Sequence, residues 1–359
     1  LALQVALIAA AGKHDYSLGM EYYLEKETRW SLDDNGTDNL LALSNDFVNP
    51  NPNLPYNGHY SRTGETTTGE SKTLALYAFD TITLNDQWLL NGGLRYENYK
   101  SNSGYEDGTS ASRSDNMLSW NIGAVYKIRP NGNVYASMGK SFNPAAEDLT
   151  ARSRGNEIDL APEESYGIEI GTKWELFDER LLASAALFQT KKTNARTDDP
   201  VDNDRDDLLN GEQLVRGLEL SAFGQINEQL SITASYTYQD SKVTKAAGDD
   251  AAQVGHQLAR TPEHSLSLWT NYQPTAQLTM GLGYEHVDER YNSASPGGRE
   301  RAPGYDVFDA MMSYQVSNDL TLQLNANNIT DERYIDLVGG GHFVPGAGRI
   351  YNLSAFYSF

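Results

Sequence analysis

The sequence predicts an all-β protein, an antiparallel transmembrane β-barrel, on the strength of three observations. Apolar and polar residues alternate with a period of two, short and long connections follow one another along the chain, and no apolar run is long enough for a membrane-spanning helix. These features exclude a bundle of membrane helices. They favour strands that each have one apolar face.

The alternation is clearest in segments 88–96 and 166–176. Successive side chains of a strand point to opposite faces of the sheet, so such a segment has one face for lipid and one for the lumen. The expected lipid-facing residues are Leu90, Leu94, Ile168, Ile170, Leu322 and Leu324. The expected lumenal residues are Arg95, Glu169 and Lys173.

The connections carry the strongest signal. The short ones are expected at Gly12 to Asp15, Asn85 to Gln87, Pro130 to Asn133, Asp178 to Arg180, Asn227 to Gln229, Pro274 to Gln277 and Ser317 to Asp319. The long ones are expected at 32–69, 104–113, 143–162, 197–210, 243–260, 293–302 and 335–346. They join about fifteen strands as consecutive hairpins, with tight periplasmic turns at one end and long extracellular loops at the other.

The amino-acid composition argues against several classes of partner and site. The net charge is -21, with 49 acidic residues against 28 Lys and Arg, which argues against a nucleic-acid partner. The absence of Cys removes disulfides and thiolate metal sites. The 22 Tyr, against 10 Phe and 5 Trp, suit a boundary between hydrocarbon and water.

An odd number of strands predicts that part of the barrel is missing. Strands one and fifteen would run in the same direction, whereas bacterial single-chain barrels close with even counts. The chain also begins with Leu1 inside an apparent strand. We therefore expect residues 1–359 to be the C-terminal part of a barrel whose first strands lie upstream.

Several blocks, in order, resemble TonB-dependent siderophore receptors, specifically the catecholate-siderophore group. They are SFNPAAEDL at 141–149, LAPEESYGIEIGTKWELFDERL at 160–181, ALFQTKKTNART at 186–197, GEQLVRGLEL at 211–220, TPEHSLSLWTNY at 261–272, APGYDVFDAMMSY at 302–314, LNANNITDERY at 324–334 and PGAGRIYNLSAFYSF at 345–359. The resemblance extends from about residue 70 to the end. Segment 32–69 matches nothing in the family.

The resemblance implies a 22-stranded barrel around an N-terminal plug in the bacterial outer membrane. It implies import of a ferric siderophore, with energy relayed by the TonB complex through an N-terminal region. This chain would supply about fifteen strands and lack the plug. The expected partners are thus the ferric siderophore, outer-membrane lipid and TonB.

Recognition of an anionic ferric chelate needs cations and aromatic rings on the long-loop side. The candidate ligand-binding residues are Arg152, Arg154, Arg290, Tyr291, Arg299, Arg301, His342 and Phe343. The alternative reading of each is a solvated loop charge or a rim aromatic. Asp202, Asp204 and Asp206 have alternate spacing that could turn carboxylates onto calcium, but a solvated acidic loop explains them better. We expect no cofactor.

Enzymatic function has little support. The sequence contains no GxSxG, HExxH, P-loop or dinucleotide motif, and its six His are scattered. We therefore expect a transporter and not an enzyme. The main alternative is a passive channel of the porin type, which would keep its lumen open and its strand count even.

Overall fold

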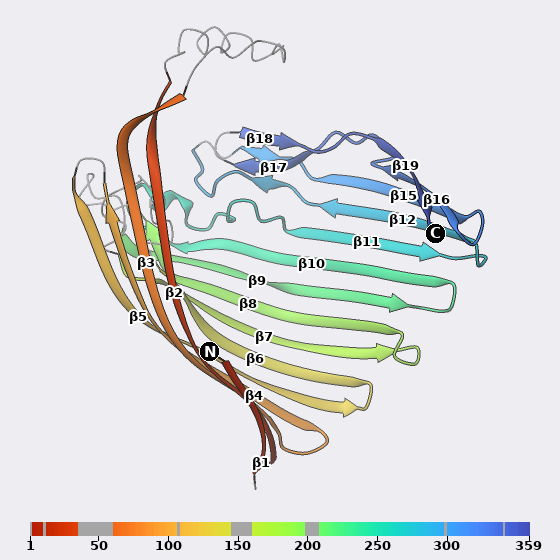
Figure 1. Ribbon diagram of the computed structural model, residues 1–359, viewed down its shortest axis with the longest axis horizontal. Helices are drawn as coiled ribbons and strands as arrows, with labels where there is room; N and C mark the ends of the chain where they lie inside the picture. The colour runs from red at the N-terminus through yellow and green to blue at the C-terminus, as the bar shows by residue number, and fades with distance from the viewer. Residues whose placement is uncertain are drawn as a thin grey trace.

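The structure, a computed structural model, describes residues 2–9, 12–34, 60–105, 108–144, 160–197, 208–297, 300–339 and 342–359. Within these ranges, 15 antiparallel strands form one continuous sheet whose order follows the sequence (Figure 1). The strands are β1 (Ala2–Ala9), β2 (Gly12–Asp34), β3 (Tyr60–Thr83), β4 (Trp88–Gly104), β5 (Ser110–Arg129), β6 (Gly132–Asn143), β7 (Glu163–Leu176), β8 (Leu181–Thr197), β9 (Leu208–Gln225), β10 (Leu230–Lys245), β11 (His264–Tyr272), β12 (Leu278–Val287), β15 (Tyr305–Gln315), β16 (Leu320–Asn327) and β19 (Ile350–Tyr357). The predicted fold class and the count of about fifteen strands are confirmed.

The short turns form where an Asn or Ser side-chain oxygen can accept hydrogen bonds from nearby backbone N–H groups. The Asn85 Oδ1 atom accepts hydrogen bonds from the backbone N–H groups of Gln87 and Trp88, both at 2.9 Å. Asn227 repeats this arrangement in the turn between β9 and β10. Side chains that satisfy local N–H groups allow the chain to reverse within a few residues. Figure 1 shows the short turns along one edge of the sheet and the longer connections along the other.

Most connections lie near where the sequence predicts them. Strands β5 and β9 begin at Ser110 and Leu208, inside the predicted loops 104–113 and 197–210, and two predictions differ more from the structure. The predicted turn at Gly12 to Asp15 is wrong, because these residues begin β2 and pair with β1 and β3. The predicted loop 32–69 is too long, because β2 continues to Asp34 and β3 begins at Tyr60. Alternation weakens in polar strand extensions, so periodicity alone made these strands too short.

Three long connections contain their own small elements. The 3-10 helix η2 (Gly248–Gln253) follows β10, the hairpin of β13 (Arg290–Tyr291) and β14 (Arg301–Ala302) follows β12, and the hairpin of β17 (Ile335–Gly339) and β18 (His342–Pro345) follows β16. No helix within the described residues is long and apolar enough to cross a membrane.

The two faces of the sheet differ as expected. Leu94, Ile168 and Ile170 are 56%, 54% and 57% exposed on one face, which we call the outer face. The opposite, inner face holds polar networks: Arg95 contacts Glu21 and Glu97 at 2.7 and 2.8 Å. On the inner face the Tyr135 hydroxyl donates to Glu169, and Lys173 lies over the Tyr135 ring. An apolar outer face and a polar inner face are typical of an outer-membrane barrel wall.

Candidate functional site

Three long connections meet at a cavity on the loop side of the sheet, which we call the loop-side cavity. Its volume is ≈ 300 Å³. The connections come from β10–β11, β12–β15 and β16–β19. The lining residues are Arg260, Arg290, Leu337, Val338, Gly339, His342 and Val344. Two guanidinium groups and an imidazole therefore meet beside an apolar wall.

Arg290 ties two of these connections together. Its Nη1 atom donates to the Asp336 carbonyl at 2.9 Å and its Nη2 atom to the Ile335 carbonyl at 2.6 Å. Both acceptors belong to the first strand of the β17–β18 hairpin. The Nε atom is buried and has no hydrogen-bond partner among the described residues. Arg290 therefore holds the hairpin in place with donors that a ligand would otherwise use.

Arg260 links the third connection, between β10 and β11, to the other two. Its backbone N–H donates to the Tyr291 carbonyl at 2.8 Å, and its φ of 61° lies in the left-handed region that non-glycine residues rarely occupy. Its guanidinium lies against Gly339, where an added Cβ would be 2.1 Å from Nη2. Only glycine at that position leaves space for the cation. Arg260 is exposed and lines the cavity.

Two aromatic rings pack behind Arg290. Tyr305 and Tyr334 have ring centroids 4.3 Å apart, and the Arg290 guanidinium lies 5.5 Å from the Tyr305 ring centre. The Tyr305 hydroxyl donates to Glu285 at 2.6 Å. Burial raises the pKa of the Tyr334 phenol, so this side chain stays neutral at physiological pH. These rings add apolar and cation–π contacts without adding negative charge.

The structure brings some of the predicted ligand residues together. Arg290 and His342 line the cavity, and Phe343 is 62% exposed next to His342. Tyr291 and Arg301 form a separate group, because the Tyr291 hydroxyl and the Arg301 Nη1 atom both contact Glu289, at 2.9 and 2.8 Å. The remaining predicted residues lie outside the described ranges, namely Arg152, Arg154 and Arg299, as do Asp202, Asp204 and Asp206.

Sequence reasoning missed Arg260, Tyr305 and Tyr334. Arg260 lies in the predicted long connection 243–260, so a complete list of loop cations would have included it. No comparable signal existed for the two tyrosines. Their proximity arises because the connection after β16 folds back over the inner face of β15. Such a tertiary contact is invisible to periodicity.

A second hollow on the inner wall is a weaker candidate. It extends from β3 to β8 and measures ≈ 450 Å³, and its lining combines glycines and small side chains with Phe79, Trp120 and two cations, Arg95 and Lys140. Lys140 is already paired with Glu164. Arg95 is already paired with Glu21 and Glu97. Within the described residues, no group of three or more His, Cys, Asp or Glu could hold a metal ion. The loop-side cavity is therefore the better site, and its chemistry suits non-covalent binding of an anionic, aromatic ligand.

Comparison with known proteins identifies a matching family and related sequences. Residues 6–329 match the family described as TonB dependent receptor-like, beta-barrel. The chain is 32% identical over 94% of its length to the Probable TonB-dependent receptor BfrD of Bordetella pertussis, of which it covers 49%. It is 30% identical over 95% of its length to the Catecholate siderophore receptor Fiu of Escherichia coli K12, of which it covers 48%.

Solved structures agree with the sequence matches. The crystal structure of the ferric-catecholate import receptor Fiu from E. coli K12, in its closed form, aligns with a TM-score of 0.85 at 28% identity, covering 100% of this chain and 54% of that one. The siderophore receptor PiuA from Acinetobacter baumannii aligns with a TM-score of 0.88 at 26% identity, covering 99% and 55%. The chain thus spans about half the length of the curated relatives it matches.

Proposed function

Because this chain belongs to the TonB-dependent receptors of the bacterial outer membrane, we propose that it forms part of the wall of a receptor that imports a ferric siderophore of the catecholate class. The relatives are receptors and transporters, and family membership gives no support to a porin-type channel. Our proposal includes the expectation that the chain is not an enzyme.

The observation that carries the ligand proposal is the loop-side cavity. Arg260 and Arg290 supply positive charge in a chain whose net charge is -21, and Leu337, Val338 and Val344 line the cavity beside them with apolar surface. A ferric catecholate is anionic and presents flat aromatic ligands, so both features match it. Arg260 is the cavity cation with an exposed side chain, and we assign it the direct contact.

Substitution of Arg260 tests this assignment. In the native protein that carries residues 1–359, Arg260→Gln should weaken binding of a ferric tris-catecholate by roughly five- to tenfold at low salt, and by less at high salt because ions screen the lost attraction. Binding is measured by fluorescence quenching. Arg129→Gln, at the short-turn end, is the control with the same loss of charge. Equal affinities of both variants for several ferric catecholates would remove Arg260 from the pocket.

The energy-coupling partner and the rest of the barrel belong to the same proposal. We infer that this chain is the C-terminal part of a longer receptor whose plug and first strands precede it, and that the TonB complex acts through that N-terminal region. The support is the coverage of about half of each relative. Translation of the DNA upstream of residue 1 tests it, and a stop codon in frame just before Leu1 would contradict it.

A further inference from the structure

The outer face carries a row of cations at the loop-side edge of its apolar band. On β2, Lys26 lies two residues after the exposed Leu24, and on β3, Lys72 lies two residues before the exposed Leu74. On β6, Lys140 follows Met138 in the same way. Alternate positions share a face, so these cations point outward with the apolar residues. The full row consists of Lys26, Lys72, Lys100, Lys140, Lys191, Arg216 and Lys242.

The strand registers connect the members of the row. Lys72 pairs directly with Lys100, and Tyr166 pairs with Lys140 on one side and Lys191 on the other. Leu214 pairs with both Lys191 and Lys242. Lys100 pairs with Ser114 on β5. Lys140 pairs with Trp120, which lies on the same strand and nearer the short-turn end. Strands in a barrel are tilted, so residues at the same height relative to the membrane are staggered in this way from one strand to the next. The row therefore runs along the membrane boundary.

Two groups in the row contain more cations than acids. Glu70 contacts Lys26 at 2.7 Å and also Lys72, and Asp240 contacts Arg216 at 2.9 Å and Lys242 at 3.2 Å. We call these the Glu70 triad and the Asp240 triad. Each has a surplus of one positive charge.

The carboxylates lie beneath the cations. The Glu70 and Asp240 side chains are 26% and 28% exposed, whereas the four cations are 64%, 46%, 57% and 36% exposed. The surface presented outward is therefore cationic, although the chain as a whole has a net charge of -21.

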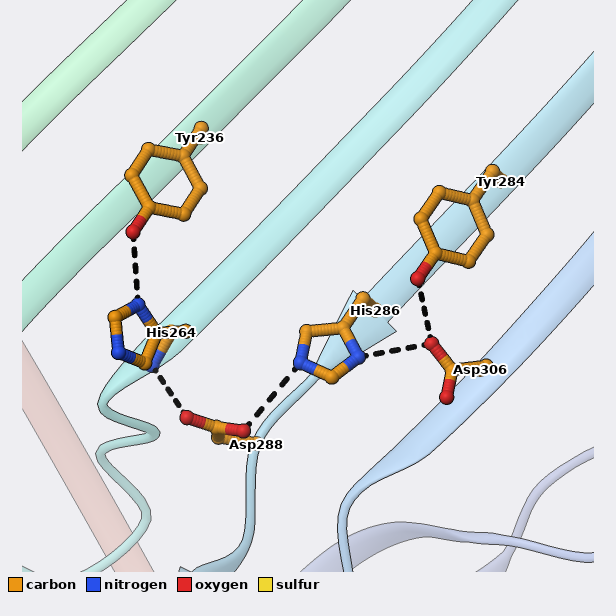
Figure 2. Close-up of polar contacts among 6 residues, drawn as sticks. All are labelled: Tyr236, His264, Tyr284, His286, Asp288 and Asp306. Carbon is orange, nitrogen blue, oxygen red and sulfur yellow. Dashed lines mark hydrogen bonds and ion pairs between the residues drawn. The ribbon is translucent and has the colours of Figure 1, made fainter.

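The next sector of the same face lacks this surplus. Figure 2 shows a chain of polar contacts there, in which His286 lies between Asp288 and Asp306, with its Nε2 and Nδ1 atoms 3.3 and 2.9 Å from their oxygens. The Tyr284 hydroxyl also donates to Asp306, at 2.6 Å. One imidazole therefore faces two carboxylates, so this group contains no surplus of cations. Surplus positive charge is thus concentrated on the β2–β10 side.

We propose that the Glu70 triad and the Asp240 triad dock phosphate groups of lipid headgroups in the outer leaflet of the membrane. Basic residues at a membrane boundary attract anionic headgroups, and Arg and Lys both bind phosphate well. The apolar band on the short-turn side of each triad offers the acyl chains a surface, with Leu24 and Leu74 two residues from cations of the first and Leu220 four residues from Arg216 of the second. A free phosphate ion has no acyl chain that could contact that surface, so we assign the triads to lipid.

The test compares variants with equal losses of charge. In the native protein, Lys26→Gln with Lys72→Gln, and Arg216→Gln with Lys242→Gln, should each reduce binding of bisphosphorylated lipid A by at least about tenfold, measured by native mass spectrometry in detergent. Lys173→Gln with Lys192→Gln is the control, because Lys173 lies over Tyr135 and Lys192 pairs with Glu163 on the inner face. Heat-modifiable gel mobility verifies that each variant is folded.

Four outcomes decide between the proposal and its alternatives. Loss of lipid A with unchanged binding of phosphatidylcholine, whose phosphate charge is balanced by its own ammonium group, supports a site for anionic phosphate headgroups. Equal loss in the inner-face control, or unchanged lipid A binding in both outer-face variants, overturns the proposal. Full displacement of lipid A by inorganic phosphate at low concentration also overturns it, because the acyl chains would then contribute nothing. Siderophore binding is not part of the readout, so this test is independent of the proposed ligand.

Discussion

Arg290 illustrates how a residue selected for its charge can have a structural role. Its two terminal nitrogens donate to the Ile335 and Asp336 carbonyls, so the β17–β18 hairpin depends on them. Arg290→Gln should leave these carbonyls without charged donors and destabilise the hairpin locally by about 1–3 kcal/mol. Hydrogen exchange of segment 335–345 is the measurement, and it should become faster. Arg301→Gln, which removes only the contact to Glu289, is the control. Unchanged exchange in the Arg290 variant would show that the tether is dispensable.

Glu70 offers a test by pH. It lies on β3 beyond the apolar residues Leu74 and Leu76, and hydrogen bonds from Lys26 and Lys72 lower its pKa to about 2. The unfolded pKa is about 4.3, so this interaction favours the folded state above that pH and is lost as the pH falls through about 2. Carbon NMR of the labelled carboxyl should show titration near the lower value. In Lys26→Gln with Lys72→Gln the midpoint should rise, and identical midpoints in both proteins would contradict the triad.

At the scale of strands, the sequence was sufficient for most of the sheet because lipid and lumen impose alternation on every strand. Asn85 and Asn227 also marked their turns, since their side chains satisfy local N–H groups. The β17–β18 hairpin and the position of Arg260 were not predictable. They depend on tertiary contacts, such as the Arg260 backbone N–H with the Tyr291 carbonyl, that leave no periodic signal.

The assignment of faces leads to a prediction for β4 and β7. Spin labels at Leu94, Ile168 and Ile170 should be accessible to oxygen in the bilayer, and labels at Arg95 and Glu169 to a water-soluble nickel complex. The reason is that the first three are largely exposed, whereas Arg95 and Glu169 join polar networks on the opposite face. Electron paramagnetic resonance in the native protein gives both accessibilities. A uniform response along either strand would show that the face assignment is wrong.

At the scale of the whole molecule, the sheet order begins at β1 and ends at β19, and these two strands do not pair with each other within the described residues. Each unpaired backbone group in hydrocarbon costs several kcal/mol, so an open edge is not stable in lipid. We therefore predict that residues 1–359, expressed alone, aggregate or pair their edges with another chain when refolded in detergent.

The decisive comparison is between residues 1–359 and the same sequence extended with its upstream region. Both β1 and β19 require partners, so only the extended protein should run as a compact, heat-modifiable monomer on gels and take up ferric catecholate in an energy-dependent way. Gel mobility depends only on whether the sheet edges are paired, whereas energy-dependent uptake also requires the coupling region that we propose. A fragment that closes but does not transport would mean that β1 and β19 can pair directly. A fragment that does both would contradict the partial-barrel proposal and the coupled mechanism together.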